Sequence, residues 1–304
     1  MEVFDLDPGI SLIDLTPPIA GLESFLGTYV VKAGKIALID VGPASTLPNL
    51  FAGLAKLKIE PEEVDYVLCT HIHIDHTGGA GGALKRMPKA TCIMHEHVRY
   101  HLANPAKLWK GSLQTLEKLA QDYGEPEAVN ETQLMTASEG MIIDLGGIKL
   151  EVMLTPGHAR HHLSFLDRAN SRVFAGEAVG INGASYNVSR PATPSPFDLK
   201  QALISLDKLI AAEPSKIFYA HLGAVSNGTE HLKQFKNQLL LWAEIISRHV
   251  NDQTEWQEIL REIRGQDKLL DYMDKMPKGR LERELYFIKN SIAGLREDLG
   301  KDSK

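Results

Sequence analysis

The sequence predicts a mixed α/β protein, and two patterns along the chain support this fold class. Short apolar, β-prone runs alternate with segments whose apolar residues recur every three or four positions, as in strands followed by amphipathic helices. Beyond about residue 226 only the helical pattern remains. We therefore divide the 304 residues into an α/β domain, residues 1–225, and a helical C-terminal extension, residues 226–304.

Composition limits the classes of function. A hydrophobic content of 43% and a charged content of 24% are ordinary for a globular protein, and the length allows a sizeable core. The formal net charge of −6 provides no basic surface for nucleic acid, so we expect a small-molecule substrate. No apolar run is long enough to span a membrane, and residues 1–8 lack the features of a signal peptide.

Two cysteines, Cys69 and Cys92, cannot form a disulfide framework. Both lie in apolar, strand-like runs, which favours buried free thiols. This usage fits a reducing compartment, and we expect a cytoplasmic protein.

The first half of the chain begins with strands. A Pro17-Pro18 break and a turn at residues 32–35 divide the opening segment, and leucines at helical spacing follow it. A Gly-Gly turn marks a later hairpin. The predicted strands are residues 3–14, 22–31, 35–40, 64–70 and 90–94, the predicted helices are residues 45–58 and 106–122, and the predicted hairpin is residues 141–155.

The second half continues the alternation and then becomes helical. A polar turn joins two apolar runs, and a segment rich in Gly, Asn, Ser and Pro, residues 180–198, predicts a surface loop near the mouth of the site. The predicted strands are residues 163–166, 172–175 and 216–220, and the predicted helices are residues 197–212, 232–246, 252–275 and 281–299. We expect the last helices to pack on the core or on the partner in a homodimer.

The most informative stretch follows the strand at residues 64–70. It contains His71, His73, Asp75 and His76, and glycines come directly after it. Residues two apart at a strand end point to the same side, so both His71 and His73 can face one ion. Four candidate ligands at one strand end predict a metal centre, with enough groups for two neighbouring sites.

Two further polar residues follow predicted strands. His158 comes after a Pro-Gly turn, in the same kind of position as His71. Asp40 ends a buried strand, where a carboxylate needs a hydrogen-bond partner. Asp40 either caps the following helix or accepts a hydrogen bond from a ligand histidine or its loop.

The HxHxDH pattern of residues 71–76, followed by His158, resembles the metallo-β-lactamase superfamily. The resemblance covers roughly residues 10–225 and implies a four-layer αββα sandwich, with ligands on loops along one edge. It also implies that His221 is the final metal ligand, and that Asp40 orients the ligands. Glu177 stands where the family normally has an aspartate that bridges two metals, and this departure leaves the bridging role open.

The resemblance implies a dinuclear site. His71, His73 and His158 supply three nitrogens to one divalent metal, and Asp75, His76 and His221 supply the second. Zinc is expected, with iron or manganese as alternatives. A hydroxide held between the two metals is the expected nucleophile, and Asp75 is placed to orient it or to carry a proton. No serine or cysteine nucleophile is required.

The family does not define the substrate. Asp75-His76 looks like the glyoxalase II, lactonase and phosphodiesterase branches, and a cysteine ligand typical of some true β-lactamases is absent. We predict a hydrolase of carboxylic esters, thioesters or lactones, with a phosphodiesterase or phosphotriesterase as the alternative. A diiron redox protein is less favoured because no flavodoxin-like domain is visible.

Other polar residues are open to two interpretations. His97 and His101 lie at helical spacing and could bind metal, but a solvated or substrate-proximal position is favoured. Arg160, His161 and His162 are either loop residues that bond to the backbone or contacts to substrate or a ligand. In the loop at residues 180–198, the substrate-contact candidates are Tyr186, Asn187 and Arg190. The family resemblance implies that the helix at residues 106–122 helps to wall the substrate groove.

Overall fold

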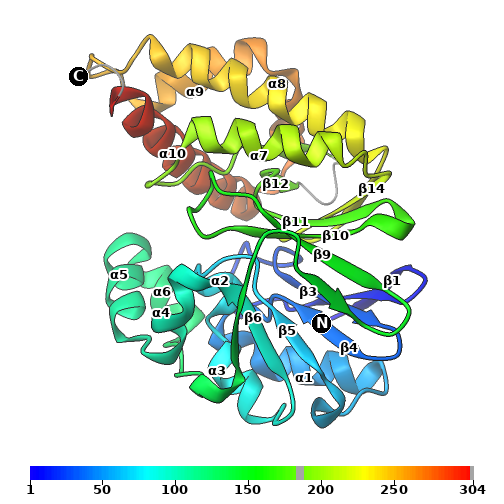
Figure 1. Cartoon of the computed structure of the whole chain (residues 1–304). Coiled ribbons are helices and arrows are strands. Elements are labelled where there is room, and N and C mark those ends of the chain that lie inside the picture. The colour runs from blue at the N-terminus through cyan, green and yellow to red at the C-terminus, as the bar shows by residue number, and fades with distance from the viewer. Residues whose placement is uncertain (183–187, 302–304) are drawn as a thin grey trace.

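The computed structural model describes residues 1–182 and 188–301 and has the predicted mixed α/β architecture. Two sheets pack face to face, and helices cover the outer face of each, so the described part of the chain forms four layers (Figure 1). The predicted fold class is therefore confirmed. None of the described helices combines the length and the apolar character needed to cross a membrane.

The first sheet has seven strands within the described residues. Neighbouring strands follow the order of the chain, and the pairs from β4 to β7 are parallel. The strands are β1 (Val3–Asp7), β2 (Ile10–Asp14), β3 (Gly27–Lys32), β4 (Ile36–Ile39), β5 (Tyr66–Leu68), β6 (Thr91–His95) and β7 (Leu134–Ala137). The parallel strands end at one edge, which is where the polar motif begins.

The second sheet has the order β15-β14-β11-β10-β9-β8, in which only β11 and β14 pair in parallel. Its strands are β8 (Ile142–Asp144), β9 (Lys149–Leu154), β10 (Leu163–Asp167), β11 (Arg172–Gly176), β14 (Lys216–Tyr219) and β15 (Ala224–Ser226). A small separate pair, β12 (Ile181–Asn182) and β13 (Ser189–Arg190), borders the site.

The helices cover both sheets and one end of the sandwich. In Figure 1, α1 and α3 lie under the first sheet, α7 and α8 lie over the second, and α4–α6 lie at the same end as α10. Their bounds are α1 (Leu47–Lys56), α2 (Ile74–Thr77), α3 (Ala80–Lys85), α4 (Arg99–Ala103), α5 (Ala106–Leu116), α6 (Lys118–Tyr123), α7 (Leu199–Ala211), α8 (Gly228–Ser247), α9 (Trp256–Gln266) and α10 (Lys278–Lys301).

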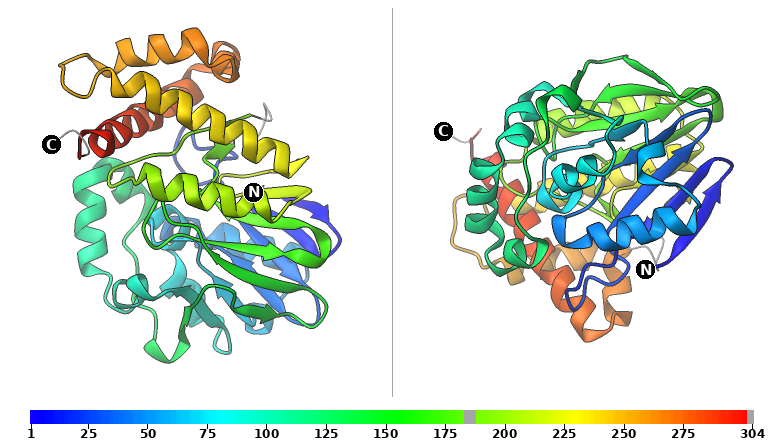
Figure 2. Two further views of the ribbon diagram at one scale, coloured as in Figure 1. Left: turned by 45° about the horizontal axis from the view of Figure 1, so that its top comes forward. Right: turned by 90° about the horizontal axis from the view of Figure 1, so that it is seen from below.

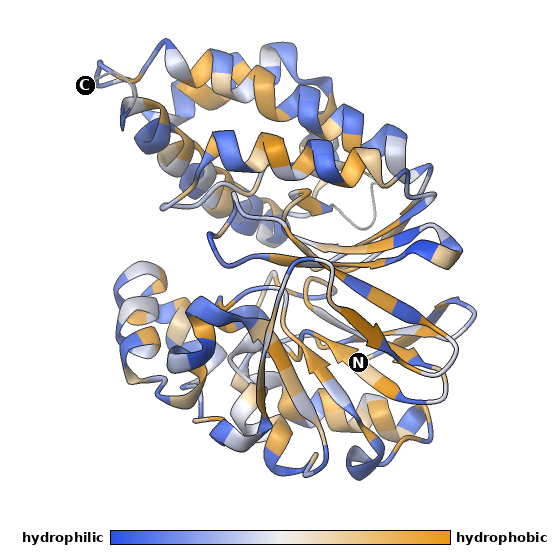
Figure 3. Ribbon diagram, in the orientation of Figure 1, coloured by the Kyte–Doolittle hydropathy of each residue, from blue (hydrophilic) through white to orange (hydrophobic). Residues whose placement is uncertain are grey.

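Three apolar clusters hold the layers together, and Figure 3 shows the apolar faces turned inward. One cluster lies between the first sheet and its helices, one between the two sheets, and one between the second sheet and α7–α10. The Tyr29 hydroxyl donates hydrogen bonds of 2.7 Å to the carbonyls of Tyr219 and Gly223, which joins the two sheets. Cys69 and Cys92 are buried free thiols, as predicted.

The C-terminal helices share their apolar cluster with the second sheet. The predicted domain division at residue 225 consequently stays a prediction. Helix α10 packs closely on the chain before α7. A Cβ added at Gly294 would lie only 2.1 Å from the Thr193 carbonyl oxygen, so this contact requires glycine. Residues 189–193 are buried. The prediction of a surface loop is wrong for these residues, since α10 covers them.

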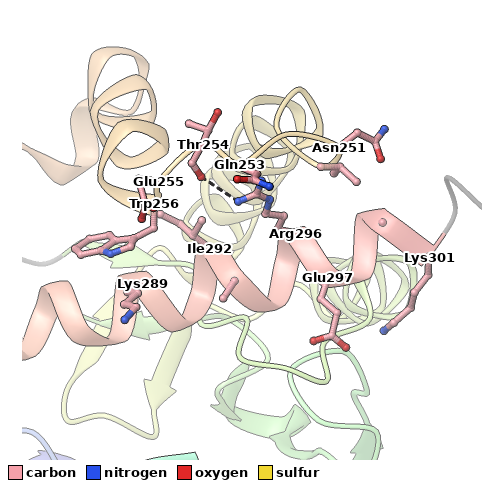
Figure 4. Close-up of a pocket in the computed structure, with 13 residues that line it drawn as sticks. Asn251, Gln253, Thr254, Glu255, Trp256, Lys289, Ile292, Arg296, Glu297 and Lys301 are labelled. Carbon is pink, nitrogen blue, oxygen red and sulfur yellow. Dashed lines mark hydrogen bonds between the residues drawn. The ribbon is translucent and has the colours of Figure 1, made fainter.

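An open groove lies along the face of α10 that carries Arg296 (Figure 4). The segment at residues 250–256 forms its other wall. Arg296 of α10 donates to the Thr254 carbonyl at 3.0 Å and pairs with Asp252 at 3.2 Å, so the main cation of this groove is already bound. Arg296 thus ties α10 to the segment that leads into α9.

Two predicted elements are interrupted. The expected strand at residues 3–14 is a hairpin, because Pro8-Gly9 forms a turn in which Gly9 has φ +73°. The expected helix at residues 106–122 divides into α5 and α6 at Glu117, whose φ is +51°. This break lets α6 direct Tyr123 toward the site.

Candidate metal centre

The site lies where several strands of both sheets end. Asp40 follows β4, His71 and His73 follow β5, His158 follows β9, Glu177 follows β11 and His221 follows β14. The short helix α2 begins directly after His73 and carries Asp75 and His76. The His76 carbonyl accepts hydrogen bonds from the backbone N–H groups of Val41 and Gly42, both at 2.9 Å, which fixes this turn beside the end of β4.

The structure brings all seven predicted ligands together. Two groups have ligand atoms that lie within 4.8 Å of one another, namely His71, His73, His158 and Glu177, and Asp75, His76 and His221. Among the described residues no other cluster of this kind occurs. His97 and His101 therefore belong to no metal-binding cluster in the described part of the chain.

Glu177 contacts both groups of ligands. Its Oε2 atom lies 3.1 Å from His71 Nε2 and 3.0 Å from His158 Nε2, and its Oε1 atom lies 3.1 Å from His221 Nε2. Burial disfavours the charged carboxylate, but the His158 and His221 imidazoles outweigh burial and hold the pKa of Glu177 well below its usual range. The longer side chain thus reaches both halves of the site as an anion.

The histidine nitrogens meet the requirements of metal ligands. His158 donates through Nδ1 to the Ala192 carbonyl at 2.8 Å, so its Nε2 lone pair is free, and this atom lies 3.1 Å from His73 Nδ1. The Nε2 atoms of His71 and His76 are buried and have no hydrogen-bond partner among the described residues. These buried nitrogens face the Glu177 carboxylate at 3.1 and 3.4 Å, and such a set of nitrogen and oxygen donors fits a divalent cation such as zinc.

Asp40 orients two of these histidines. Its carboxylate accepts hydrogen bonds from the backbone N–H and the hydroxyl of Thr70, at 2.8 and 2.7 Å, and lies 3.2 Å from His76 Nδ1. The Thr70 hydroxyl in turn lies 2.9 Å from His71 Nδ1. Because Nδ1 of each ring is engaged here, Nε2 of each ring faces the site.

His162 supports the backbone of Glu177. Its Nε2 accepts the Glu177 N–H at 3.0 Å, so Nδ1 carries the proton and donates to the Thr155 hydroxyl at 2.8 Å. The ring is fully buried, and a Cβ at Gly176 would lie 2.4 Å from its Nε2 atom. His162 therefore contacts the backbone of one ligand residue and lies outside the group that faces the pocket.

A cavity of about 530 Å³ opens over the centre. Its walls come from α5 and α6 on one side and α10 on the other, and the two views of Figure 2 place these helices at the same end of the molecule. Leu108, Leu116, Leu119 and Phe287 line it. The helix predicted to wall the groove does so, and α10 supplies the opposite wall.

Tyr123 is a polar residue of this cavity that sequence reasoning missed. Its side chain is 1% exposed, and its hydroxyl has no hydrogen-bond partner among the described residues. Burial, together with the negative charges of Asp75 and Glu177, raises the pKa of Tyr123 well above its usual value, so the hydroxyl keeps its proton. An isolated tyrosine at the end of an apolar helical run provides no sequence signal of this position.

The predicted substrate contacts have different positions. Arg190 lines the cavity, but its guanidinium is held by Glu284 of α10, with Nη2 to Oε2 at 3.1 Å, and by the Pro191 carbonyl at 3.1 Å. Tyr186 and Asn187 lie outside the described residues. Arg160, His161, His97 and His101 all line the cavity.

Comparisons with known proteins agree with this geometry. The sequence model of the metallo-beta-lactamase superfamily matches residues 27–221. The metallo-beta-lactamase fold-containing protein ST1585 of Sulfurisphaera tokodaii is 32% identical over 214 residues, which cover 68% of this chain and 77% of that protein. The crystal structure described for ST1585 superposes with a TM-score of 0.72 at 24% identity, over 95% of this chain and 98% of that chain.

Two relatives carry names of hydrolases. A hydroxyacylglutathione hydrolase of Idiomarina loihiensis is 26% identical over 187 residues, 62% of this chain and 56% of that enzyme. An N-acyl homoserine lactonase of Rhizobium johnstonii is 32% identical over 116 residues, 38% of this chain and 40% of that enzyme. The first match therefore spans just over half of that enzyme's own length, and the second spans less than half.

Proposed function

The chain belongs to the metallo-beta-lactamase superfamily, and from this membership and its site we propose that it is a metal-dependent hydrolase of carboxylic ester, thioester or lactone bonds. One observation carries the proposal. Seven ligand side chains, most of them buried, converge next to a cavity whose walls include leucines of α5 and α6 and Phe287 of α10.

Two divalent metal ions, when bound, would act as Lewis acids and lower the pKa of water toward neutrality. His71, His73 and His158 would hold one ion, Asp75, His76 and His221 the other, and the two oxygens of Glu177 face both groups. The chain's own residues then supply orientation. Asp75 is half-buried with its carboxylate 3.5 Å from His76 Nε2, where it can receive a proton from the attacking water.

Tyr123 supplies a second polar function in the proposed mechanism. Its hydroxyl is protonated, buried and unpartnered, so it can donate a hydrogen bond to the oxygen of a carbonyl under attack. A fixed, buried donor stabilises developing negative charge more strongly than it stabilises the neutral ground state. The apolar side chains of the cavity support an acyl chain next to this donor.

The substrate class is the finer part of the proposal. Relatives named as a lactonase and a hydroxyacylglutathione hydrolase support the cleavage of acyl–oxygen and acyl–sulfur bonds. A panel of N-hexanoyl homoserine lactone, a hexanoyl thioester, phenyl hexanoate, a β-lactam and bis(4-nitrophenyl) phosphate tests it directly. We expect the carboxylic substrates to have kcat/KM values at least about tenfold above the phosphodiester and the β-lactam.

The same panel needs a control for contaminating hydrolases. The His73→Ala protein, purified in parallel, must lack the activity that is assigned to this chain. Dominant turnover of bis(4-nitrophenyl) phosphate would replace the proposed substrate class by the phosphodiesterase alternative. Absence of any hydrolysis by the metal-loaded protein would reject the hydrolase proposal for these substrate classes.

The role of Tyr123 predicts a separable effect. Tyr123→Phe is expected to lower kcat/KM by about tenfold or more, since a hydrogen bond to a charged group contributes about 1.5–3 kcal/mol. The free energy of unfolding should not fall, because the lost hydroxyl has no partner among the described residues. Steady-state kinetics and urea unfolding on the same preparation measure both, and unchanged kcat/KM would remove Tyr123 from the mechanism.

A further inference from the structure

One side of the cavity mouth is basic, although the chain as a whole carries a formal charge of −6. Exposed Lys107, from α5, and exposed Arg160, two residues after His158, both line the cavity. His101 lines the same cavity, and burial together with the charges of Lys107 and Arg160 lowers its pKa. The rings of His97 and His161 line the cavity next to this basic rim, which is formed by Lys107 and Arg160.

The cations of the basic rim are unpaired. Within residues 1–182 and 188–301, no carboxylate forms an ion pair with Lys107 or Arg160, and the Glu96 carboxylate lies 3.8 Å from His97 Nε2. By contrast, exposed Arg168 pairs with Glu151 at 2.8 Å. Two free cations beside a cavity provide a site for an anion.

Apolar side chains, among them Phe287, Leu116 and Leu119, line another part of the cavity. The Phe25 ring lies 4.2 Å from the His221 ring and 5.4 Å from the Phe287 ring, so an aromatic stack borders the second ligand group. The His161 ring lies 6.5 Å from the His73 ring, and the adjacent Arg160 belongs to the basic rim. The cavity therefore has two cations at its mouth, with Arg160 on the His73 side, and apolar side chains of α5, α6 and α10 elsewhere along its walls.

We propose that Lys107 and Arg160 form a carboxylate-binding site, and that the substrate is an amphipathic ester or thioester with an anionic group on the His73 side. The apolar part of this substrate lies against Phe287 and the leucines of α5 and α6. This assignment rests on the hydrolase function proposed above for its reacting bond, but the carboxylate site itself requires no turnover. Under this proposal, esters that are apolar at both ends are not the preferred substrates.

Binding of inert amide analogues tests the site without chemistry. Isothermal titration of the metal-loaded protein compares 4-(hexanoylamino)benzoate with its neutral isostere 4-(hexanoylamino)benzamide. We expect the benzoate to bind about fivefold more tightly or better, and this ratio should fall as sodium chloride is raised. Equal affinities of the two compounds for the unmodified protein would overturn the proposal.

Variants of Arg160 and Lys107 test whether these two side chains bind the carboxylate of the benzoate. Arg160→Gln and Lys107→Gln should each lower the benzoate-to-benzamide ratio, and the double variant should bring it close to one. Lys110→Gln is the matched control, because Lys110 is exposed on the same helix and does not line the cavity. A ratio that survives in the double variant, or that falls equally in Lys110→Gln, would contradict the assignment.

Kinetics with matched esters places the carboxylate on the substrate. One pair, 4-carboxyphenyl and 4-carbamoylphenyl hexanoate, carries the charge on the leaving group, and the second, the phenyl monoester of adipic acid and phenyl hexanoate, carries it on the acyl chain. One anionic ester should exceed its neutral partner about fivefold in kcat/KM, with the advantage reduced in Arg160→Gln.

If no ester is cleaved while the benzoate-to-benzamide affinity ratio persists, the hydrolase proposal fails and the carboxylate site stands. If neither anionic ester is preferred, the amphipathic substrate is rejected.

Discussion

Replacement of His73 by alanine is expected to lower kcat/KM by more than about 100-fold, because even the loss of a residue that only supports a metal ligand costs about 10- to 100-fold. His73 Nδ1 lies 3.1 Å from His158 Nε2, and His73 belongs to the ligand group that also contains His71, His158 and Glu177. Steady-state kinetics on the preferred substrate of the panel, with metal supplied in excess, measures the loss.

The fold should survive this change. His73 is the least buried histidine of its group, and it lies on the loop between β5 and α2, outside the apolar clusters. Circular dichroism and the urea midpoint in the presence of a chelator should therefore match those of the parent protein. His231→Ala, on the distant helix α8, is the matched control. Retained activity in His73→Ala would remove this residue from the metal centre.

Arg190→Met is expected to reduce the free energy of unfolding by about 3–5 kcal/mol, the usual consequence of leaving one charge of a buried pair without its partner. Arg190 is 1% exposed and Glu284 is 3% exposed, and the ion pair joins the chain before α7 to α10. Burial opposes the ionisation of Glu284, but Arg190 outweighs it and lowers the pKa of this carboxyl. Urea unfolding monitored by circular dichroism measures the loss.

Two further variants separate this pair from ordinary surface charges. The double variant with Arg190→Met and Glu284→Met should lose less than Arg190→Met alone, since it leaves no uncompensated charge. Arg168→Met breaks an exposed pair with Glu151 and should cost at most about 1 kcal/mol. If Arg190→Met were as mild as Arg168→Met, the pair would not hold α10 against the site.

Local spacing explains why so much of the site could be predicted from the sequence. His71, His73, Asp75 and His76 fall within six residues at the end of β5, where the alternation of the strand and the first turn of α2 direct them to one edge. The remaining ligands follow strands whose apolar runs are evident. The family pattern, rather than any local signal, connected Glu177 and His221 to this edge.

Contacts between distant segments explain what could not be predicted. The sequence predicts Arg190 as a substrate contact in a surface loop, yet Glu284, from a helix that begins almost 90 residues later, binds its guanidinium. The periodicity of α10 indicates an amphipathic helix but not the surface it covers. Tyr123 was missed for a related reason, since its position depends on the break at Glu117 between α5 and α6.

The central claim is that seven side chains hold two divalent metal ions. Elemental analysis of the protein, purified without added metal, then saturated with zinc and passed through a desalting column, tests it most directly. We predict about two zinc ions per chain in the parent protein and a lower content in His73→Ala. A parent protein that retains no metal under these conditions would contradict the claim.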